Sequence, residues 1–348
     1  MRILTVVGTR PQIVKAAPVS RALRAAGHEE ILLFTGQHYD RGLAGAVAED
    51  AGLPVPARTL GVGSGSHAFQ VGGIARGVAG FAAECRPAAV LAAGDTNSAL
   101  GAALGARAAG IPLVHGEAGV RLGSFDLPEE ANRVVADHLA DLLLCPTERA
   151  AAAARAERPR GTVVAAGDPL LDALLAREDG APGDPSPGPF LCTFHRAENT
   201  DDPARLRRLL EGLAGVPGTV LLPLHPRTAT ALDREGTGSV PLNVRLGPPL
   251  EPRLLVEALR AAPAVLTDSG GVQREAYWLG VPCIVLRDSC EWRETVEEGW
   301  AVCAGADPAR IRAAAANPPR GSRPPDREAF GGGGAAARWV RAVEERFG

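Results

Sequence analysis

Short apolar runs alternate with helical patterns through the first half of the chain. The runs are apolar at nearly every position, which is typical of strands buried on both faces of a parallel sheet. Segments of roughly a dozen residues with helical periodicity separate them. The expected strands cover residues 3–7, 30–34, 89–93, 112–115, 142–145 and 162–164, and the expected helices cover 12–26, 68–85, 98–109 and 128–140.

A second alternation of the same kind follows a stretch at 176–189 that is rich in Pro, Gly and Asp and indicates a linker. Its expected strands cover 190–195, 219–225, 243–246, 264–266 and 282–286. The pattern predicts an α/β fold with two Rossmann-like parallel-sheet domains that face a cleft. We expect the domains at 1–175 and 190–334, with a terminal helix at 335–348 that packs back on the first domain.

Nearly every cluster of polar residues falls directly after an expected strand, where an open parallel sheet binds its ligands. In the first domain these residues are Arg10, Lys15, His38, Asp95 and Glu117. In the second domain they are His195-Arg196, His225, Ser269-Gly270-Gly271 and Arg287-Asp288.

The Ser269-Gly270-Gly271 turn joins an expected strand to a helix expected from Gln273. The first amides of a helix have no partner inside it and carry partial positive charge, so they suit a phosphate. Glu275 lies about one helical turn further on, where a carboxylate reaches ribose hydroxyls beside that phosphate. Ser269 or Asp268 can cap the start of this helix. The alternative is a strand-to-helix turn with ordinary glycines.

Asp95, Glu117 and Glu129 are three carboxylates that are expected to converge on one site and to do general acid and base work. Each also has a structural explanation. Asp95 could cap the helix that starts near Thr96, Glu117 could pair with Arg121, and Glu129 has the capping-box spacing from Asp126.

Two basic residues add to this picture. His195 closes a strand and is followed by Arg196, a pair suited to charge-assisted hydrogen bonds with a diphosphate; the alternative is a histidine satisfied at a sheet edge. Lys15 is the single lysine among 37 basic side chains, which suggests that a compact ammonium is needed there. Neither a metal-binding spacing nor a nucleophilic triad is evident.

Composition excludes several classes of protein. The net charge of −3 argues against nucleic-acid or membrane-surface binding, and the six scattered cysteines suggest free thiols. No G-x-G-x-x-G follows the first strand and no Walker A loop occurs, which argues against a nicotinamide dinucleotide or P-loop site. Without a leader or a long apolar run, we expect a cytoplasmic protein.

In their order along the chain, these clusters resemble the non-hydrolysing UDP-N-acetylglucosamine 2-epimerases, which have the glycosyltransferase-B architecture. The resemblance spans residues 1 to about 300. The matching motifs are Gly8-Thr9-Arg10-Pro11-Gln12-Ile13-Val14-Lys15, Gly36-Gln37-His38-Tyr39-Asp40, Gly94-Asp95-Thr96-Asn97-Ser98, His115-Gly116-Glu117-Ala118-Gly119-Val120-Arg121, Pro128-Glu129-Glu130-Ala131-Asn132-Arg133, Phe194-His195-Arg196-Ala197-Glu198-Asn199 and Asp268 to Glu275.

The resemblance implies a reversible epimerisation at C2 of UDP-N-acetylglucosamine to UDP-N-acetylmannosamine, by elimination of UDP to a 2-acetamidoglucal and re-addition. It implies that Asp95, Glu117 and Glu129 handle the protons, without saying which one removes the C2 proton, and that His195 is catalytic beside the diphosphate. The nucleotide-sugar contacts it implies are Arg10, Lys15, Ser269, Gly270, Gly271 and Glu275. It further implies a homodimer that uses no metal and no cofactor.

Three features depart from the family's pattern. Gln12 stands where many members have Glu. The chain reads Glu291-Trp292-Arg293-Glu294 where members often read Glu-Arg-Pro-Glu, so an arginine contact to the nucleotide is in question and Arg293 is the candidate substitute. Only Gly and Ser occur at 63–66, where members activated by a second substrate molecule carry Gln, so no such activation is expected.

The sequence leaves the exact substrate and outcome open. The same 2-epimerisation on another UDP-2-acetamido sugar, such as a diacetamido-uronic acid, fits these motifs equally well. A hydrolysing epimerase that releases free ManNAc fits less well, because its members usually lack the Pro at position 11. A glycosyltransferase of this fold, or a non-enzymatic nucleotide-sugar sensor, has no use for the carboxylates.

Overall fold

The structure is a computed structural model that describes residues 1–36, 48–49, 51–178, 187–236 and 240–348. The chain divides into two compact units: unit 1 is Met1–Leu175 with Arg327–Gly348, and unit 2 is Ala176–Asp326. Two sequence-based expectations fall partly outside the described residues, namely the motif at 36–40 that contains His38 and the linker at 176–189.

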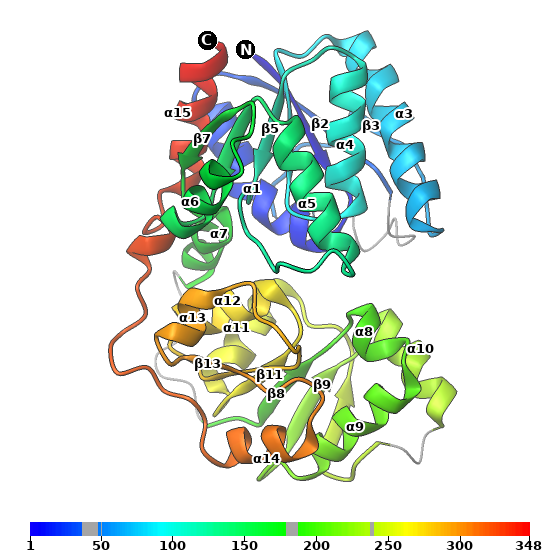
Figure 1. The fold of residues 1–348 in the computed structure, drawn as a ribbon, viewed down its shortest axis with the longest axis vertical. Helices are drawn as coiled ribbons and strands as arrows, with labels where there is room; N and C mark the ends of the chain where they lie inside the picture. Colours follow the sequence, from blue (N-terminus) through cyan, green and yellow to red (C-terminus); the bar gives the residue numbers. More distant parts are fainter. Residues whose placement is uncertain (37–47, 50, 179–186, 237–239) are drawn as a thin grey trace. The chain divides into compact units, whose positions relative to one another are not determined.

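Unit 1 contains a seven-stranded sheet in the order β3-β2-β1-β4-β5-β6-β7, and all of its strand pairs are parallel (Figure 1). Its strands are β1 (Arg2–Val7), β2 (Glu29–Phe34), β3 (Arg58–Thr59), β4 (Ala89–Ala93), β5 (Leu113–Gly116), β6 (Leu142–Cys145) and β7 (Thr162–Ala165). The helices of its first segment are α1 (Arg10–Ala25), α3 (His67–Cys85), α4 (Asn97–Ala108), α5 (Pro128–Leu139), α6 (Glu148–Ala156) and α7 (Pro169–Glu178), whose last residues belong to unit 2.

The C-terminal segment of unit 1 comprises η2 (Glu328–Phe330) and α15 (Ala335–Phe347). Helix α15 packs beside α1 and β6, and its Trp339 belongs to the same apolar cluster as Ile3 and Leu91 (Figure 1). The indole nitrogen of Trp339 donates to the carbonyl of Gly167 at 3.2 Å. The last residues of the chain therefore complete the core of the unit that the first residues begin.

Unit 2 contains a six-stranded parallel sheet in the order β10-β9-β8-β11-β12-β13. Its strands are β8 (Phe190–Thr193), β9 (Val220–Pro223), β10 (Val244–Gly247), β11 (Val265–Thr267), β12 (Cys283–Val285) and β13 (Ala301–Cys303). Its helices are α8 (Ala197–Thr200), α9 (Pro203–Ala214), α10 (Pro226–Glu235), α11 (Pro252–Ala261), α12 (Gly270–Trp278), α13 (Arg293–Glu297) and α14 (Pro308–Ala316).

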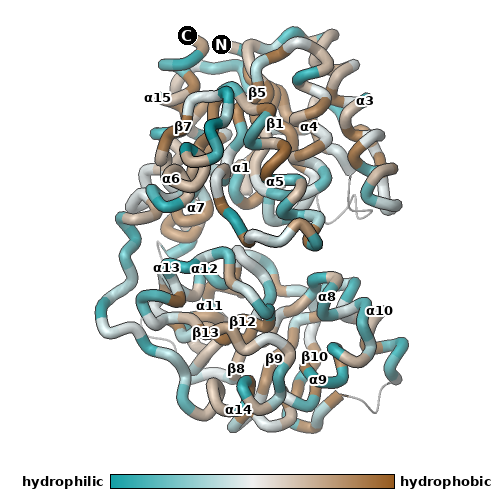
Figure 2. The backbone as a smooth tube through the Cα atoms, viewed as in Figure 1, coloured by the Kyte–Doolittle hydropathy of each residue, from teal (hydrophilic) through white to brown (hydrophobic). Residues whose placement is uncertain are grey.

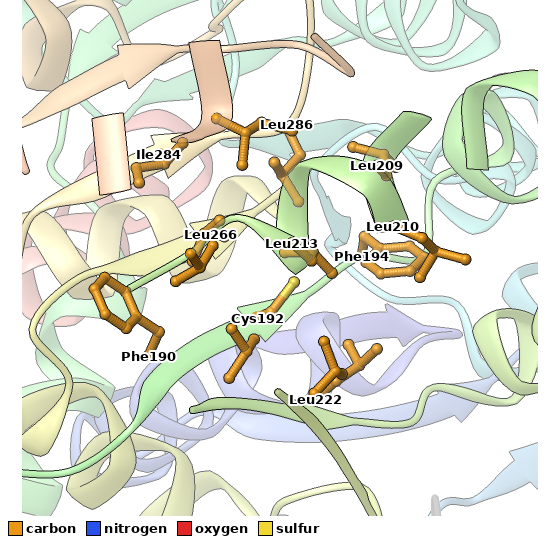
Figure 3. Packing of buried hydrophobic residues seen from close by; sticks show 14 of the residues in the cluster. Phe190, Cys192, Phe194, Leu209, Leu210, Leu213, Leu222, Leu266, Ile284 and Leu286 are labelled. Atoms are coloured by element: carbon orange, nitrogen blue, oxygen red, sulfur yellow. The ribbon is translucent and has the colours of Figure 1, made fainter. Parts of the chain in front are cut away.

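Successive residues of a strand point to opposite faces of its sheet. In unit 2, both sets of residues are buried in apolar clusters, so both faces of the sheet are covered. Leu266 and Ile284 join one apolar cluster with residues of α9, which Figure 3 shows from close by. Their strand neighbours Val265 and Cys283 join the cluster on the other face. Figure 2 shows the result along the chain, where apolar segments coincide with the strands and polar segments with many of the connecting loops.

The prediction of an α/β fold built on two parallel sheets is confirmed. The structure adds strands β3 and β13, which have two and three residues and are too short for a clear sequence pattern. Helix α7 continues to Glu178, and residues 327–334 belong to unit 1. Helix α12 begins at Gly270 and not at Gln273, because Ser269 caps it.

Candidate active site

Each sheet reverses its strand order at one point, which is where open α/β sheets bind ligands. In unit 1 the reversal lies between β1 and β4, whose carboxyl ends lead to Arg10 and Asp95. In unit 2 it lies between β8 and β11, whose carboxyl ends lead to His195 and Ser269. The polar residues expected from the sequence therefore gather at the binding edge of each sheet.

Asp95 follows β4 and is fixed by helix α5. Its carboxylate accepts a hydrogen bond of 2.6 Å from the guanidinium of Arg133, which is fully buried. Asn132 donates to the backbone carbonyl of Asp95 at 2.8 Å. The cap of α4 is Thr96, whose hydroxyl accepts from the amide of Ala99, so Asp95 is not the capping residue. Its side chain is 18% exposed, so the carboxylate is partly accessible while it pairs with Arg133.

Glu117 follows β5, the strand next to β4, and its carboxylate contacts the ammonium group of Lys15 from α1. Its backbone has a φ of 59°, in the left-handed region that a non-glycine residue enters at a cost of about 1–3 kcal/mol. Arg121 pairs with Asp137 and Glu157, so the alternative pairing of Glu117 with Arg121 is not formed. A strained residue that is held this way is typical of a functional site.

Trp339 of helix α15 lies against Gly116, the last residue of β5 and the residue before Glu117. A side chain at Gly116 would overlap the ring of Trp339, so only glycine lets the indole pack against the end of β5. The position before Glu117 is thereby fixed by the terminal helix.

Glu129 and Arg10 lie at the starts of two helices. Glu129 is half-buried in the first turn of α5, whose N-cap is Leu127, so the capping box with Asp126 is not formed. Arg10 is the first residue of α1. The side-chain oxygen of Gln12 accepts from the amides of Gly8 and Thr9 at 2.9 and 3.2 Å, which fixes the turn that presents Arg10.

In unit 2, Asp268 ties His195 to the start of α12. This carboxylate is fully buried and accepts from the backbone amides of His195 and Arg196. The Nδ1 atom of His195 lies 3.7 Å from the same carboxylate, and its ring stacks on His225 with centroids 4.9 Å apart. The imidazole is 34% exposed, so it is both held in place and accessible.

The Ser269-Gly270-Gly271 turn forms the beginning of α12, as expected for an anion site. The hydroxyl of Ser269 accepts from the amide of Val272, and the glycines occupy the first two helical positions, where amides have no partner inside the helix. A side chain at Gly270 would overlap the carboxylate of Glu291.

The surroundings of two side chains in unit 2, Glu275 and Trp292, could not be anticipated from the sequence. Glu275 is buried, and its carboxylate lies 3.6 Å from Arg177. Trp292 is also buried, and the guanidinium of Arg274 lies 3.8 Å from its ring centroid, so Trp292 has a packing role. The next residue along the chain, Arg293, is exposed and is the first residue of α13.

Sequence reasoning missed the residues that hold the site in place. Arg133 and Asp268 lay within the noted motifs, but their partners, Asp95 and His195, are far away in sequence. His115 and Asp137 form a buried pair whose ring nitrogen and carboxylate oxygen are 2.6 Å apart. Their signal in the sequence is a polar residue within an otherwise apolar strand or packed helix face, which requires a partner when buried.

The described residues contain no group of three or more His, Cys, Asp or Glu side chains arranged to hold a metal. All six cysteines are free thiols; Cys145, Cys192 and Cys283 are buried, whereas Cys85, Cys290 and Cys303 are half-buried. None of the described helices is long and apolar enough to span a membrane.

Comparison with known proteins now adds to this geometry. The family model for UDP-N-acetylglucosamine 2-epimerase matches residues 21–344. A UDP-2,3-diacetamido-2,3-dideoxy-D-glucuronate 2-epimerase of Pseudomonas aeruginosa is 38% identical, over 97% of this chain and 98% of its own length. A UDP-N-acetylglucosamine 2-epimerase of Methanocaldococcus jannaschii is 34% identical, over 88% of each chain.

The fold agrees with these relatives. The crystal structure of the Methanocaldococcus jannaschii UDP-GlcNAc 2-epimerase, in complex with UDP-GlcNAc and UDP, superposes with a TM-score of 0.91 at 31% identity, covering 99% of this chain and 100% of that one. The glycosyltransferase-B architecture expected from the sequence is thus confirmed. From the family match, the identities and the fold together, the chain belongs to the UDP-N-acetylglucosamine 2-epimerase family.

Proposed function

We propose that the protein reversibly inverts C2 of a UDP-2-acetamido sugar, converting UDP-N-acetylglucosamine to UDP-N-acetylmannosamine. The observation that carries this proposal is the pair of carboxylates at the ends of neighbouring strands β4 and β5, in a chain of this family. Asp95 is held by Arg133, and Glu117 contacts Lys15. Two positioned carboxylates beside cations supply what proton removal and delivery require.

The proposed reaction removes the C2 proton and expels UDP from C1, which leaves a 2-acetamidoglucal. UDP then adds back to C1 while a proton reaches the opposite face of C2. Atoms and electrons balance without a cofactor, because the proton and UDP are both returned. Asp95, Glu117 and Glu129 are the proposed proton carriers, and the base is not assigned among them.

The remaining site residues are proposed to bind the nucleotide sugar. His195 is proposed to act at the diphosphate, since its ring is accessible and its backbone is tied to the start of α12. Ser269, Gly270 and Gly271 are proposed to bind phosphate oxygens through the first amides of α12. Arg10 and Lys15 are proposed to contact the substrate from unit 1, and Glu275 the ribose.

A second candidate substrate is a UDP-diacetamido-uronic acid. The observation that favours it is the 38% identical Pseudomonas aeruginosa relative, which acts on UDP-2,3-diacetamido-2,3-dideoxy-D-glucuronate and matches this chain over 97% of its length. The reaction at C2 is the same for both sugars, so the residues proposed above serve either one.

Three further properties remain proposals. The family resemblance supports a homodimer and a cytoplasmic location. The Gly and Ser residues at 63–66 support a reaction that needs no activation by a second substrate molecule. Light scattering at known concentration tests the first of these, and kinetics with UDP-ManNAc as the sole added sugar test the third.

The function is tested by incubating the purified protein with each UDP-sugar separately and following the anomeric protons by NMR. The proposal predicts a new UDP-sugar with inverted C2 from at least one substrate. Release of free ManNAc would indicate a hydrolysing enzyme instead, and no conversion of either sugar would contradict the proposal.

A further inference from the structure

A buried histidine lies between the two loops that carry the proposed catalytic carboxylates. The side chain of His115 in β5 is fully buried. Its Nε2 atom lies 2.9 Å from the carbonyl oxygen of Gly94, the residue before Asp95. Its Nδ1 atom lies 2.6 Å from a carboxylate oxygen of Asp137 on α5.

Both ring nitrogens of His115 therefore face acceptors. A carbonyl oxygen only accepts hydrogen bonds, so Nε2 must carry a hydrogen. Burial alone would raise the pKa of Asp137, but the hydrogen bond from His115, the nearby charge of Arg121 and the Gly119 amide together lower that pKa below its ordinary value. The Nδ1 atom lies against this carboxylate, so both ring nitrogens of His115 are engaged by oxygen atoms of neighbouring elements.

The charges around this ring are balanced within a short network. Arg121 lies 2.7 Å from the second oxygen of Asp137 and also pairs with Glu157. The buried carboxylate of Asp137 is thus paired with a guanidinium, as a buried charge requires. The nearby thiol of Cys145 stays neutral, since burial raises its pKa to about 12.

The same network spans three backbone positions with positive φ. Gly94, Glu117 and Gly119 have φ values of 84°, 59° and 77°. His115 binds the carbonyl of Gly94, and Asp137 binds the amide of Gly119 at 2.9 Å. Glycine adopts such φ values freely, whereas the conformation of Glu117 is unfavourable and persists where surrounding contacts over-determine it. His115 thus contacts the residue directly before Asp95, and Asp137 contacts Gly119, which follows Glu117 in the next loop.

We propose that His115 is a positioning residue for the epimerisation: a buried ring that, with Asp137, holds the Gly94–Asp95 loop and the Glu117–Gly119 loop so that both carboxylates face the substrate. This inference rests on the proposed function, because it assigns Asp95 and Glu117 their catalytic roles. His115 itself does not touch the reacting atoms, since it is fully buried.

The hydrogen bonds of the ring are tested first, without any substrate. Protein labelled with ¹⁵N-histidine is compared with the His115→Asn variant to assign the His115 signals. We expect Nε2 to carry a hydrogen that exchanges slowly with water, because it is buried and donates to the carbonyl of Gly94. An Nε2 atom without a hydrogen overturns the proposal. Asp137→Asn, which removes the carboxylate beside Nδ1, should change the chemical shift of Nδ1, and an unchanged shift contradicts the contact.

The positioning role is tested by kinetics on the same variants. We expect His115→Asn and Asp137→Asn to lower kcat by about 100-fold while KM changes by less than about threefold, since a small misplacement of catalytic groups has that effect. His67→Gln, at an exposed position on α3, is the matched control with unchanged kcat. A folded His115→Asn variant with wild-type kcat overturns the proposal.

These outcomes separate this inference from the proposed function. If the wild-type protein converts neither UDP-sugar, the proposed function fails and the positioning role fails with it, while the NMR measurement still decides whether Nε2 of His115 donates to Gly94. If the wild type is active and His115→Asn is equally active, only the present inference is contradicted.

Discussion

Lys15 and Glu117 are in direct contact, although 102 residues separate them in sequence. Their side chains are only 13% and 9% exposed, so the charges interact with little screening by water. Lys15 is the one lysine in a chain whose other basic residues are all arginine. The contact explains that choice, because a compact ammonium fits in this space and a planar guanidinium is larger.

We therefore predict that Lys15→Arg lowers kcat/KM by about tenfold or more, which corresponds to losing one charge-assisted hydrogen bond. Lys15→Met, of similar length but uncharged, is the comparison. Initial rates of C2 inversion measure the effect. Wild-type activity in Lys15→Arg, together with loss of activity in Lys15→Met, would show that only the positive charge matters.

Glu117 in unit 1 and His195 in unit 2 are each predicted to be essential. Glu117→Gln removes a proton carrier, and His195→Ala removes the proposed contact to the diphosphate. We expect each to reduce turnover by about 100-fold or more without unfolding the protein, which circular dichroism would verify. Glu84→Gln, at an exposed ion pair on α3, is the control. Near-normal turnover in either variant removes that residue from the catalytic group.

Much of the fold was predictable from the sequence, because strands buried on both faces require continuous apolar runs, as at Ile3–Val7 and Val265–Thr267. The location of the polar clusters after these strands was also predictable, since parallel strands end at the same edge. The partners of those residues were not. The contacts of Asp95 with Arg133 and of His195 with Asp268 depend on which strands and helices become neighbours.

Local backbone conformation and side-chain burial also could not be predicted from the sequence. The left-handed backbone of Glu117 is a conformation that its residue type does not indicate. It becomes visible only when β5 and its neighbours are in place. Likewise, the sequence left the role of Trp292 open, and its burial under Arg274 gives it a packing role.

That packing role leads to a stability prediction. Trp292→Ala leaves a large cavity and removes the stacking with Arg274, so we expect unit 2 to lose about 3–5 kcal/mol of unfolding free energy. Trp292→Phe keeps an aromatic ring and should lose clearly less. Urea unfolding followed by circular dichroism measures both. An unchanged midpoint for Trp292→Ala would mean that the indole is not part of the core.

Cys303 is predicted to be a reactive thiol. A hydrogen bond from Cys290 lowers the pKa of Cys303 below its ordinary value of 9.0 and outweighs its partial burial. The thiolate, which is the reactive form, therefore begins to accumulate at a lower pH than in the other cysteines. Burial raises the pKa of Cys192 and Cys283, which should react slowly.

Alkylation by iodoacetamide followed by mass spectrometry tests this ordering. The rate at Cys303 should rise with pH and level off below pH 9, whereas Cys290→Ala should move this inflection upward because the hydrogen-bond donor is lost. Equal rates at Cys303 and Cys192, or an inflection that Cys290→Ala leaves unchanged, would contradict the predicted role of Cys290.

Proton exchange at C2 tests the central claim most directly. The protein is incubated in D₂O with UDP-GlcNAc and, separately, with the UDP-diacetamido-uronic acid, and the sugar C2 position is followed by NMR. The account predicts that deuterium enters C2 as the inverted UDP-sugar forms, and that Glu117→Gln stops both. Inversion without any deuterium at C2, or no reaction with either sugar, would contradict it.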